Sequence, residues 1–497
     1  MKSKLSNKGY VIIKDEYSDK ELKNIKKELN VAPFSPYQSK FAPPPTFPVY
    51  LESKRKFYLP RYWSLDNLGP PEKFCINEGT NIDIKFNGSL RPVQEEAVAA
   101  YMKNCYPEYG GGILCLGCGF GKTIISLYLL SILKKKTLVI VHKEFLLNQW
   151  IERIKAFLPD AQVGRIQAKT FDIVGKDIVI GMLQSLSMKE FEEDAFDSFG
   201  TVIVDEAHHI SSEVFSRALP KVSFKYTIGL TATPNRADGL QKVFEWFLGP
   251  IVYRSKGGKQ HNVFVKVIEI DDNNEVYSKI EEGYDGKPVT SRMINNVANY
   301  NPRTTVIIEE VKKIMEEPGR KILLLSDRRE HLKYIYTQLT EKGFDVGFYV
   351  GGMKQKDLDI SETKPIILGT FSMSSEALDI PELNTLFMTT PKSNIEQSVG
   401  RILRKTHEIR PLIIDIKDNF RPFVNQCNKR KAFYKKCKYE VYNMKVKPIA
   451  YEETLEKNKN IHNVTTNIVD DLNEDMEICK KDSKQIQLHE CLFSDDD

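Results

Sequence analysis

The sequence predicts an α/β fold in which parallel sheets are flanked by helices, built from two consecutive βα series. Apolar runs with β-branched residues, such as 137–141, alternate with longer stretches of helical periodicity, which is typical of buried parallel strands joined by helices. A second series begins near Val263 and contains similar runs at 321–325 and 365–368. A chain of 497 residues has room for two or three domains.

The first series contains a glycine-dense turn between an apolar run and a helical pattern. Residues 116–123 read Leu-Gly-Cys-Gly-Phe-Gly-Lys-Thr. Glycines let backbone N–H groups surround phosphate oxygens, lysine supplies a positive charge, and the threonine hydroxyl can bind Mg²⁺. In the strict phosphate-loop pattern a glycine stands where this chain has Leu116. Other motifs in the chain must therefore support the assignment of a phosphate-binding loop. The predicted nucleotide-binding residues are Gly117, Cys118, Gly119, Phe120, Gly121, Lys122 and Thr123.

Two carboxylates follow the apolar run 200–204, in the sequence Asp205-Glu206-Ala207-His208. Because the carboxyl ends of parallel strands meet at one edge of a sheet, we expect them beside the glycine-rich loop. Asp205 would hold Mg²⁺ through water, with Thr123 as the other metal-binding residue, and Glu206 would polarise the attacking water. The loop and the carboxylates therefore predict a bound nucleotide with Mg²⁺; the family resemblance described next implies that the nucleotide is ATP.

These motifs resemble those of superfamily-2 helicases, and they occur in the family order between Leu90 and Arg404. The resemblance is strongest to the XPB-like transcription and repair helicases and their relatives in large DNA viruses, including poxvirus transcript-release helicases. It implies two tandem RecA-like domains that share one ATP site. The expected division is an N-terminal accessory region at 1–85, RecA-like domains at 86–252 and 253–447, and an acidic, disordered tail at 448–497.

The resemblance also implies roles for polar residues around the ATP site. Gln94 would lie near the adenine, although by spacing alone it is only a polar residue at a helix start. Residues after strands would contact nucleic acid or couple it to ATP, although polar residues follow strands in many proteins. Those residues are His142, Lys143, Gln184, Ser185, Thr231, Thr233 and Thr370.

A further element of the XPB-like helicases is linked to strand separation and commonly reads Arg-Glu-Asp. Here Arg236 and Asp238 flank Ala237. Because the central acid is missing, duplex unwinding is less well supported by the sequence than ATP hydrolysis.

The second series ends in a pattern that suits an arginine-finger site. In residues 394–404, Gln397, Arg401 and Arg404 are three or four positions apart, which would place them on one helical face. Permanently charged guanidinium groups on that face could reach the γ-phosphate of ATP bound by the other domain. A solvated helix face is the simpler alternative, but the ordered set of motifs favours the catalytic interpretation.

Charge is unevenly distributed toward the end of the chain. Residues 420–447 carry nine Lys or Arg against one Glu, whereas 451–497 carry thirteen acidic against five basic residues. We expect the basic segment mainly to dock on the second domain, through a stripe containing Phe423, Cys427 and Tyr434. In the N-terminal region, residues 54–63 interleave cations and aromatic rings, which fits packing better than base stacking.

Composition indicates an ordinary globular protein, with 41% hydrophobic and 28% charged residues. We expect an intracellular, soluble protein without membrane contact and without disulfides, since the eight cysteines are scattered. If it is viral, a cytoplasmic virus factory and the virion are the expected locations.

Three functions compete. The favoured one is a DNA helicase or translocase with 3′ to 5′ direction that acts in transcription or repair, with the transcription machinery as a candidate partner. An RNA helicase is the nearest alternative, because Asp-Glu-Ala-His also occurs in RNA-remodelling families. The third is an annealing or scaffold factor that uses ATP only as a switch.

Overall fold

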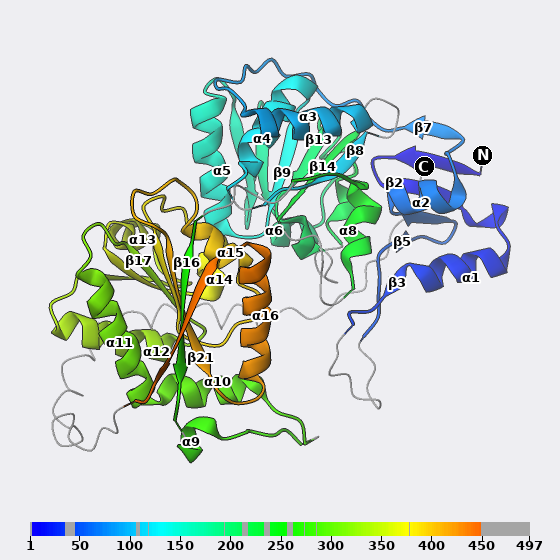
Figure 1. Cartoon of the computed structure of the whole chain (residues 1–497). Helices are drawn as coiled ribbons and strands as arrows, with labels where there is room; N and C mark the ends of the chain where they lie inside the picture. The colour runs from blue at the N-terminus through cyan, green and yellow to red at the C-terminus, as the bar shows by residue number, and fades with distance from the viewer. Residues whose placement is uncertain are drawn as a thin grey trace. The chain divides into compact units, whose positions relative to one another are not determined.

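The computed structural model forms two compact units, residues 1–258 and 259–497 (Figure 1). It describes residues 2–34, 45–105, 110–117, 119–192, 194–210, 217–232, 239–255, 262–272, 274–284, 286–376 and 378–448. Almost all of the acidic tail expected at 448–497 lies outside the described residues.

An eight-stranded sheet organises the first unit, in the order β11-β10-β12-β9-β13-β14-β8-β15. All neighbouring strands are parallel except β10 and β11. The strands are β8 (Gly111–Cys115), β9 (Thr137–Val141), β10 (Val163–Gln167), β11 (Thr170–Asp172), β12 (Ile178–Met182), β13 (Thr201–Val204), β14 (Tyr226–Thr231) and β15 (Ile251–Arg254). β15 crosses the domain boundary predicted after residue 252, and its pairing with β8 assigns Tyr253 and Arg254 to the first sheet.

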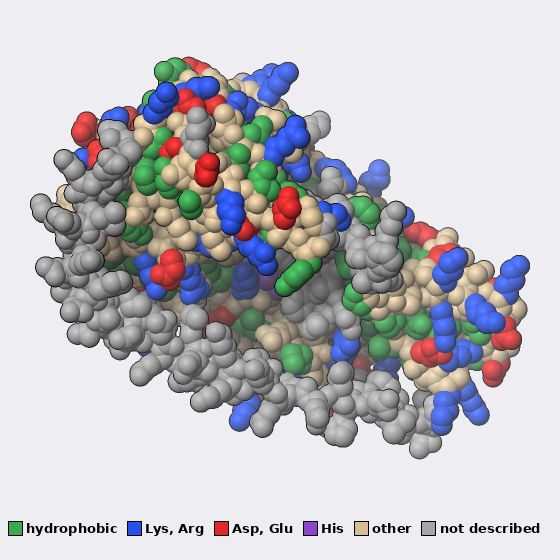
Figure 2. Space-filling view, turned by 90° about the horizontal axis from the view of Figure 1, so that it is seen from below, with side chains coloured by type: hydrophobic (Ala, Val, Ile, Leu, Met, Phe, Trp, Pro, Cys, Tyr) green, Lys and Arg blue, Asp and Glu red, His purple; other side chains and the backbone are tan. Residues whose placement is uncertain are grey.

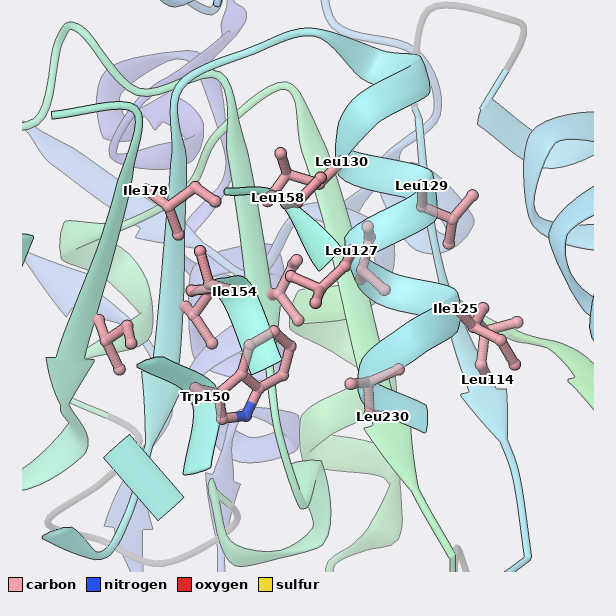
Figure 3. Close-up of a cluster of buried hydrophobic side chains, with 14 of the residues drawn as sticks. Leu114, Ile125, Leu127, Leu129, Leu130, Trp150, Ile154, Leu158, Ile178 and Leu230 are labelled. Carbon is pink, nitrogen blue, oxygen red and sulfur yellow. The ribbon is translucent and has the colours of Figure 1, made fainter. Parts of the chain in front are cut away.

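Helices cover both faces of this sheet. They are α3 (Pro92–Cys105), α4 (Lys122–Leu133), α5 (Glu144–Phe157), α6 (Leu183–Met188) and α8 (Gln241–Leu248). Alternate residues of the buried strand β9 point to opposite faces: Val139 joins the cluster under α3, α4 and α5, whereas Leu138 joins the cluster containing α6 and α8 residues. Figure 3 shows the first cluster, in which Leu127 of α4 and Ile154 of α5 lie over the strands.

The N-terminal residues form a smaller sheet, the N-terminal module, which packs against residues at and near α8 of the first unit. Its strand order is β5-β6-β2-β1-β7. Its elements are β1 (Ser3–Ser6), β2 (Gly9–Ile13), α1 (Asp19–Glu28), β5 (Leu51–Glu52), β6 (Lys56–Leu59), α2 (Arg61–Leu68) and β7 (Lys73–Cys75), with a separate pair β3 (Asn30–Val31) and β4 (Phe47–Pro48). Lys and Arg side chains with acidic ones among them lie on its visible face, at the right of Figure 2.

The packing interpretation of residues 54–63 is confirmed. Phe57 and Trp63 are buried in one cluster with Val243 of α8. Arg61 is 2% exposed, and its guanidinium donates to the backbone oxygens of Phe224 and Lys225, directly before β14. The cation therefore anchors the N-terminal module rather than facing solvent.

The second unit contains a seven-stranded, all-parallel sheet in the order β18-β19-β17-β20-β21-β16-β22. Its strands are β16 (Phe264–Ile270), β17 (Ile322–Ser326), β18 (Val346–Tyr349), β19 (Ile366–Thr370), β20 (Thr385–Met388), β21 (Leu412–Asp418) and β22 (Glu440–Val446). Its helices are α9 (Glu275–Ser278), α10 (Thr290–Asn299), α11 (Asn301–Met315), α12 (Arg329–Glu341), α13 (Gln355–Glu362), α14 (Phe371–Glu376), α15 (Glu396–Arg401) and α16 (Phe423–Lys436).

The basic segment 420–447 docks as predicted. Phe423, Cys427 and Tyr434 of α16 are each at most 1% exposed. Arg430 is also buried, because its guanidinium pairs with Asp415 of β21, whose Oδ2 accepts from Arg430 Nε and from the Tyr434 hydroxyl, each at 2.9 Å. The sequence pattern did not predict β22, whose side chains are mostly exposed or half-buried and follow no simple alternation.

Candidate ATP and nucleic-acid site

The glycine-rich loop joins β8 to α4, as predicted. Gly119 and Gly121 have φ values of 73° and 89°, and α4 begins at Lys122 directly after Gly121. The positive φ of Gly121 favours glycine, and a Cβ there would lie 2.4 Å from Gln94 Nε2 and displace the end of that side chain. Cys118, one of the predicted nucleotide-binding residues, lies outside the described residues.

Leu116 explains the departure from the strict loop pattern. Its side chain is fully buried in the cluster under α3, α4 and α5, and its N–H donates to the Thr231 backbone oxygen at 2.8 Å. The residue therefore extends β8 into the core before the loop turns. The phosphate-binding turn is left to Gly117, Gly119 and Gly121.

Gln94 uses both ends of its amide, one toward Arg91 and the other toward the glycine-rich loop. Its Oε1 accepts from the Arg91 N–H, and its Nε2 donates to the Phe120 backbone oxygen, both at 2.8 Å. Gln94 is only 2% exposed. The amide thus links the start of α3 to the loop, and an adenine contact remains a prediction.

The two carboxylates lie where the sequence predicted them, after β13 and beside the loop. The Lys122 ammonium forms a salt bridge with Glu206 Oε1. Trp150 Nε1 donates to Asp205 Oδ2 at 2.9 Å, and the Glu206 N–H donates to Asp205 Oδ1 at 2.9 Å. Burial raises the pKa of the Asp205 carboxyl, and the Lys122 ammonium partly opposes this shift.

Glu206 has an unusual backbone conformation. Its φ of 47° lies in the left-handed region, which residues other than glycine rarely adopt. Such strain is typical of residues whose side-chain direction matters for function. Here the turn after β13 directs the carboxylate to Lys122 and to His208, whose Nδ1 lies 3.5 Å from Glu206 Oε2.

His208 also connects this carboxylate to the end of β14. Its Nδ1 lies 3.2 Å from Thr231 Oγ1. Thr231 was predicted to couple ATP to nucleic acid, and the imidazole is the link that the sequence analysis missed. Thr233, Arg236 and Asp238 lie outside the described residues, so their predicted roles stay predictions.

The predicted nucleic-acid residues of the first domain lie at the ends of two adjacent strands. β9 and β12 are parallel neighbours, so His142 and Lys143 follow one strand end and Gln184 and Ser185 follow the other. Gln184 is exposed, and Ser185 Oγ accepts from the Ala168 N–H at 3.0 Å. The sheet therefore brings these four residues to one edge.

In the second unit, the prediction that Gln397, Arg401 and Arg404 share one helical face is only partly right. Gln397 and Arg401 lie on α15, but the helix ends at Arg401, so Arg404 lies beyond it. Arg401 is 9% exposed and its Nη1 donates to the Leu378 backbone oxygen at 2.7 Å. Arg404 is half-buried and pairs with Asp379.

Thr370, the remaining predicted residue, ends β19. Its Oγ1 lies 3.2 Å from Ser372 Oγ at the start of α14. The end of β19 thus contributes the Thr370 hydroxyl, and the chain that follows contributes Leu378 and Asp379, the partners of Arg401 and Arg404. Sequence spacing gave no signal for those partners, because they come from a separate loop.

Several curated relatives and many solved structures are similar to this chain. The family model described as "Type III restriction enzyme, res subunit" matches residues 87–236. A mimivirus protein named putative ATP-dependent RNA helicase is 36% identical over 452 residues, covering 89% of this chain and 86% of its own. An African swine fever virus protein with the same description is 27% identical and covers 70% of this chain and 73% of its own.

One of the similar solved structures is that of Dbp5 from S. cerevisiae bound to RNA and ADP–BeF3. It has a TM-score of 0.51 and 10% identity, and covers 79% of this chain and 93% of its own, which supports the two-domain α/β fold. No helix in the described part of the chain is long and apolar enough to cross a membrane. The fold, the ATP-site motifs and the viral relatives together show that the chain belongs to the superfamily-2 helicases of large DNA viruses, which are ATP-dependent enzymes acting on nucleic acid.

Proposed function

We propose that the protein hydrolyses ATP to move along DNA, and that the first unit holds Mg²⁺–ATP with Lys122, Thr123 and Asp205. The observation that carries the proposal is the contact between the Lys122 ammonium and the Glu206 carboxylate beside the glycine-rich loop. Thr123 and Asp205 offer oxygen donors, which Mg²⁺ prefers when it also binds substrate phosphates. Bound Mg²⁺ would neutralise charge that develops on those phosphates.

The Lys122–Glu206 salt bridge suggests how ATP prepares the site. The β- and γ-phosphates compete with Glu206 for the lysine, because their negative charge is larger than that of one carboxylate. Release from Lys122 leaves Glu206 as a hydrogen-bond acceptor for water. His208, 3.5 Å from the same carboxylate, then passes this change to Thr231 at the end of β14.

Nucleic acid would lie along the strand ends that carry His142, Lys143, Gln184 and Ser185. Contacts to a phosphate backbone give little sequence preference and strong salt dependence. The helicase resemblance supports 3′ to 5′ movement and a role in transcription, including elongation and transcript release, or in repair. The Thr-Ala pair at Thr231 and Ala232 favours DNA over the Ser-Ala variant of RNA-remodelling relatives.

Arg404 is our candidate for the arginine finger. Arg401 is buried and its guanidinium donates to the Leu378 carbonyl, so it is suited to holding the loop at 378–379 in place. Arg404 is more exposed, and its partner Asp379 could be exchanged for a γ-phosphate when the two domains close on ATP. Gln397, on the same helix as Arg401, would line this site.

RNA is the alternative substrate. The observation in its favour is that the mimivirus and African swine fever virus relatives are named putative ATP-dependent RNA helicases. An RNA helicase would use the same ATP chemistry, so only the nucleic acid distinguishes the two functions.

Steady-state ATP hydrolysis tests this proposal. The purified protein is measured alone and with single-stranded DNA, duplex DNA or single-stranded RNA, beside Lys122→Ala. We expect strong stimulation by DNA and loss of activity in Lys122→Ala, because the charge that binds the outer phosphates is removed. Equal or stronger stimulation by RNA would establish the alternative, and activity that survives in Lys122→Ala would contradict the site itself.

A further inference from the structure

Trp150 on α5 touches the proposed metal-binding carboxylate. Its indole Nε1–H donates to Asp205 Oδ2 at 2.9 Å, while the Glu206 N–H donates to Oδ1 at the same distance. Each carboxylate oxygen can accept about two hydrogen bonds, so each keeps a direction for water bound to Mg²⁺. The two donors therefore fix the plane of the Asp205 carboxylate, and each of its oxygens can still accept one more hydrogen bond.

The apolar core holds the indole ring in place. Trp150 is 1% exposed and belongs to the cluster under α3, α4 and α5. Figure 3 shows its ring in that cluster, close to Ile154 and Leu230. Because protein cores are close-packed, the ring has little freedom to turn. The indole is a donor only and does not ionise, so this contact has one fixed direction.

We propose that Trp150 is a positioning residue that orients Asp205 for Mg²⁺, an inference that rests on the proposed metal role of Asp205. A buried tryptophan could instead serve packing alone, but packing does not require its N–H to face a carboxylate. Loss of such an outer contact commonly lowers metal affinity about ten- to hundredfold. We expect the lower end, because Asp205 would reach the metal through water.

Trp150→Phe removes the donor and keeps an aromatic ring. Two readouts are compared: the Mg²⁺ concentration that half-saturates ATP hydrolysis, and the binding of a fluorescent ADP with and without Mg²⁺. We expect about a tenfold rise in the half-saturating Mg²⁺ concentration, weaker Mg²⁺-dependent ADP binding, and unchanged ADP binding without Mg²⁺. Trp246→Phe is the matched control, because Trp246 lies half-buried on α8, where it packs against the N-terminal module.

A second variant preserves the shape of the ring. β-(3-Benzothienyl)alanine, in which sulfur replaces the indole N–H, is placed at position 150 in a protein carrying Trp63→Phe and Trp246→Phe. The same background with tryptophan at 150 is its reference. We expect the same shift in Mg²⁺ requirement with little change in Tm. Reduced stability with an unchanged Mg²⁺ requirement in both variants would show that Trp150 serves packing only.

Asp205→Asn separates this inference from the proposed function. If Asp205→Asn leaves the Mg²⁺ requirement unchanged, the metal role of Asp205 fails and the assignment of Trp150 fails with it. If Asp205→Asn raises the requirement and neither change at Trp150 does, only the assignment of Trp150 is overturned.

Discussion

At the scale of single residues, Glu206 combines an unusual backbone conformation with a charged contact, which suits its proposed catalytic role. Its backbone takes a left-handed conformation, and its carboxylate contacts Lys122. The strain is confined to the turn that directs the carboxylate toward the glycine-rich loop. A neutral amide of the same size would keep the turn but lose the charge that polarises water.

Glu206→Gln should therefore keep ATP binding and lose turnover. We expect kcat to fall about 10²- to 10⁴-fold, the usual contribution of a positioned general base. ATP binding should be equal or tighter, since Lys122 no longer has a competing carboxylate. Both are measured by steady-state hydrolysis and by equilibrium binding of a fluorescent ATP analogue.

Glu152→Gln provides the control for that change, because Glu152 is exposed on α5. It should leave both quantities at the wild-type level. Near-normal turnover of Glu206→Gln would remove Glu206 from the catalytic assignment.

At the scale of elements, a buried histidine joins three parts of the second unit. His331 of α12 is 2% exposed, its Nε2 lies 3.1 Å from Thr304 Oγ1 of α11, and its Nδ1 lies 3.1 Å from Ser326 Oγ of β17. Burial, with a smaller effect of the Arg303 guanidinium, lowers the pKa of His331 to about 3. The imidazole is therefore neutral in the folded protein at physiological pH.

This shift predicts a pH-dependent stability. Below an unfolded pKa of about 6.5, the unfolded chain takes up a proton at His331 and the folded protein does not. The free energy of unfolding should fall by about 1.4 kcal/mol per pH unit from this residue until the folded pKa near 3 is reached. Urea unfolding of the full chain between pH 7.5 and 5 measures the slope.

His331→Asn should remove most of the contribution of this residue to the pH dependence of the free energy of unfolding. Thr304→Val is the matched control, since it loses a hydrogen bond to the imidazole but keeps the titrating group. It should lower stability at all pH values and retain the slope. A wild-type slope in His331→Asn would show that other groups cause the dependence.

At the scale of the whole molecule, the helicase resemblance implies that residues of both units act on one ATP. Lys122, Asp205 and Glu206 belong to the first unit, whereas Arg401 and Arg404 belong to the second. Within its own unit, each arginine already has a partner in the loop at 378–379. Closure on ATP would then exchange Asp379 for phosphate at Arg404 and leave the anchor at Arg401 in place.

Arg404→Ala should impair hydrolysis more than binding. An arginine finger typically contributes about 10³- to 10⁵-fold to kcat, whereas the affinity for ATP should change little. Single-turnover hydrolysis and analogue binding measure the two effects. Arg401→Ala should additionally lower Tm, because it removes a buried contact to Leu378.

Arg410→Ala is the control, since Arg410 is a half-buried arginine of the same unit that pairs with Glu440. It should keep wild-type kcat. A defect of Arg404→Ala in ATP binding alone would contradict the finger role.

Much of the fold could be predicted because its signals are local. The buried strand at 137–141 and the helices after the glycine-rich loop follow from apolar periodicity. Other features depend on distant partners. β22 forms although its pattern is irregular, because it pairs with β16, which lies far away in the chain. α15 ends at Arg401, before Arg404, which the spacing of the three residues did not predict.

The sequence by itself determined the α/β class, the order of the motifs, and the position next to strand ends of the residues proposed for the ATP site. These follow from short-range patterns and from the rule that parallel strands end at one edge. Only the tertiary structure decided that Trp150 contacts Asp205, that His208 links Glu206 to Thr231, and that Arg61 and Arg430 are buried. The reason is physical: the direction of a side chain depends on packing between segments that are far apart in sequence, which local patterns do not contain.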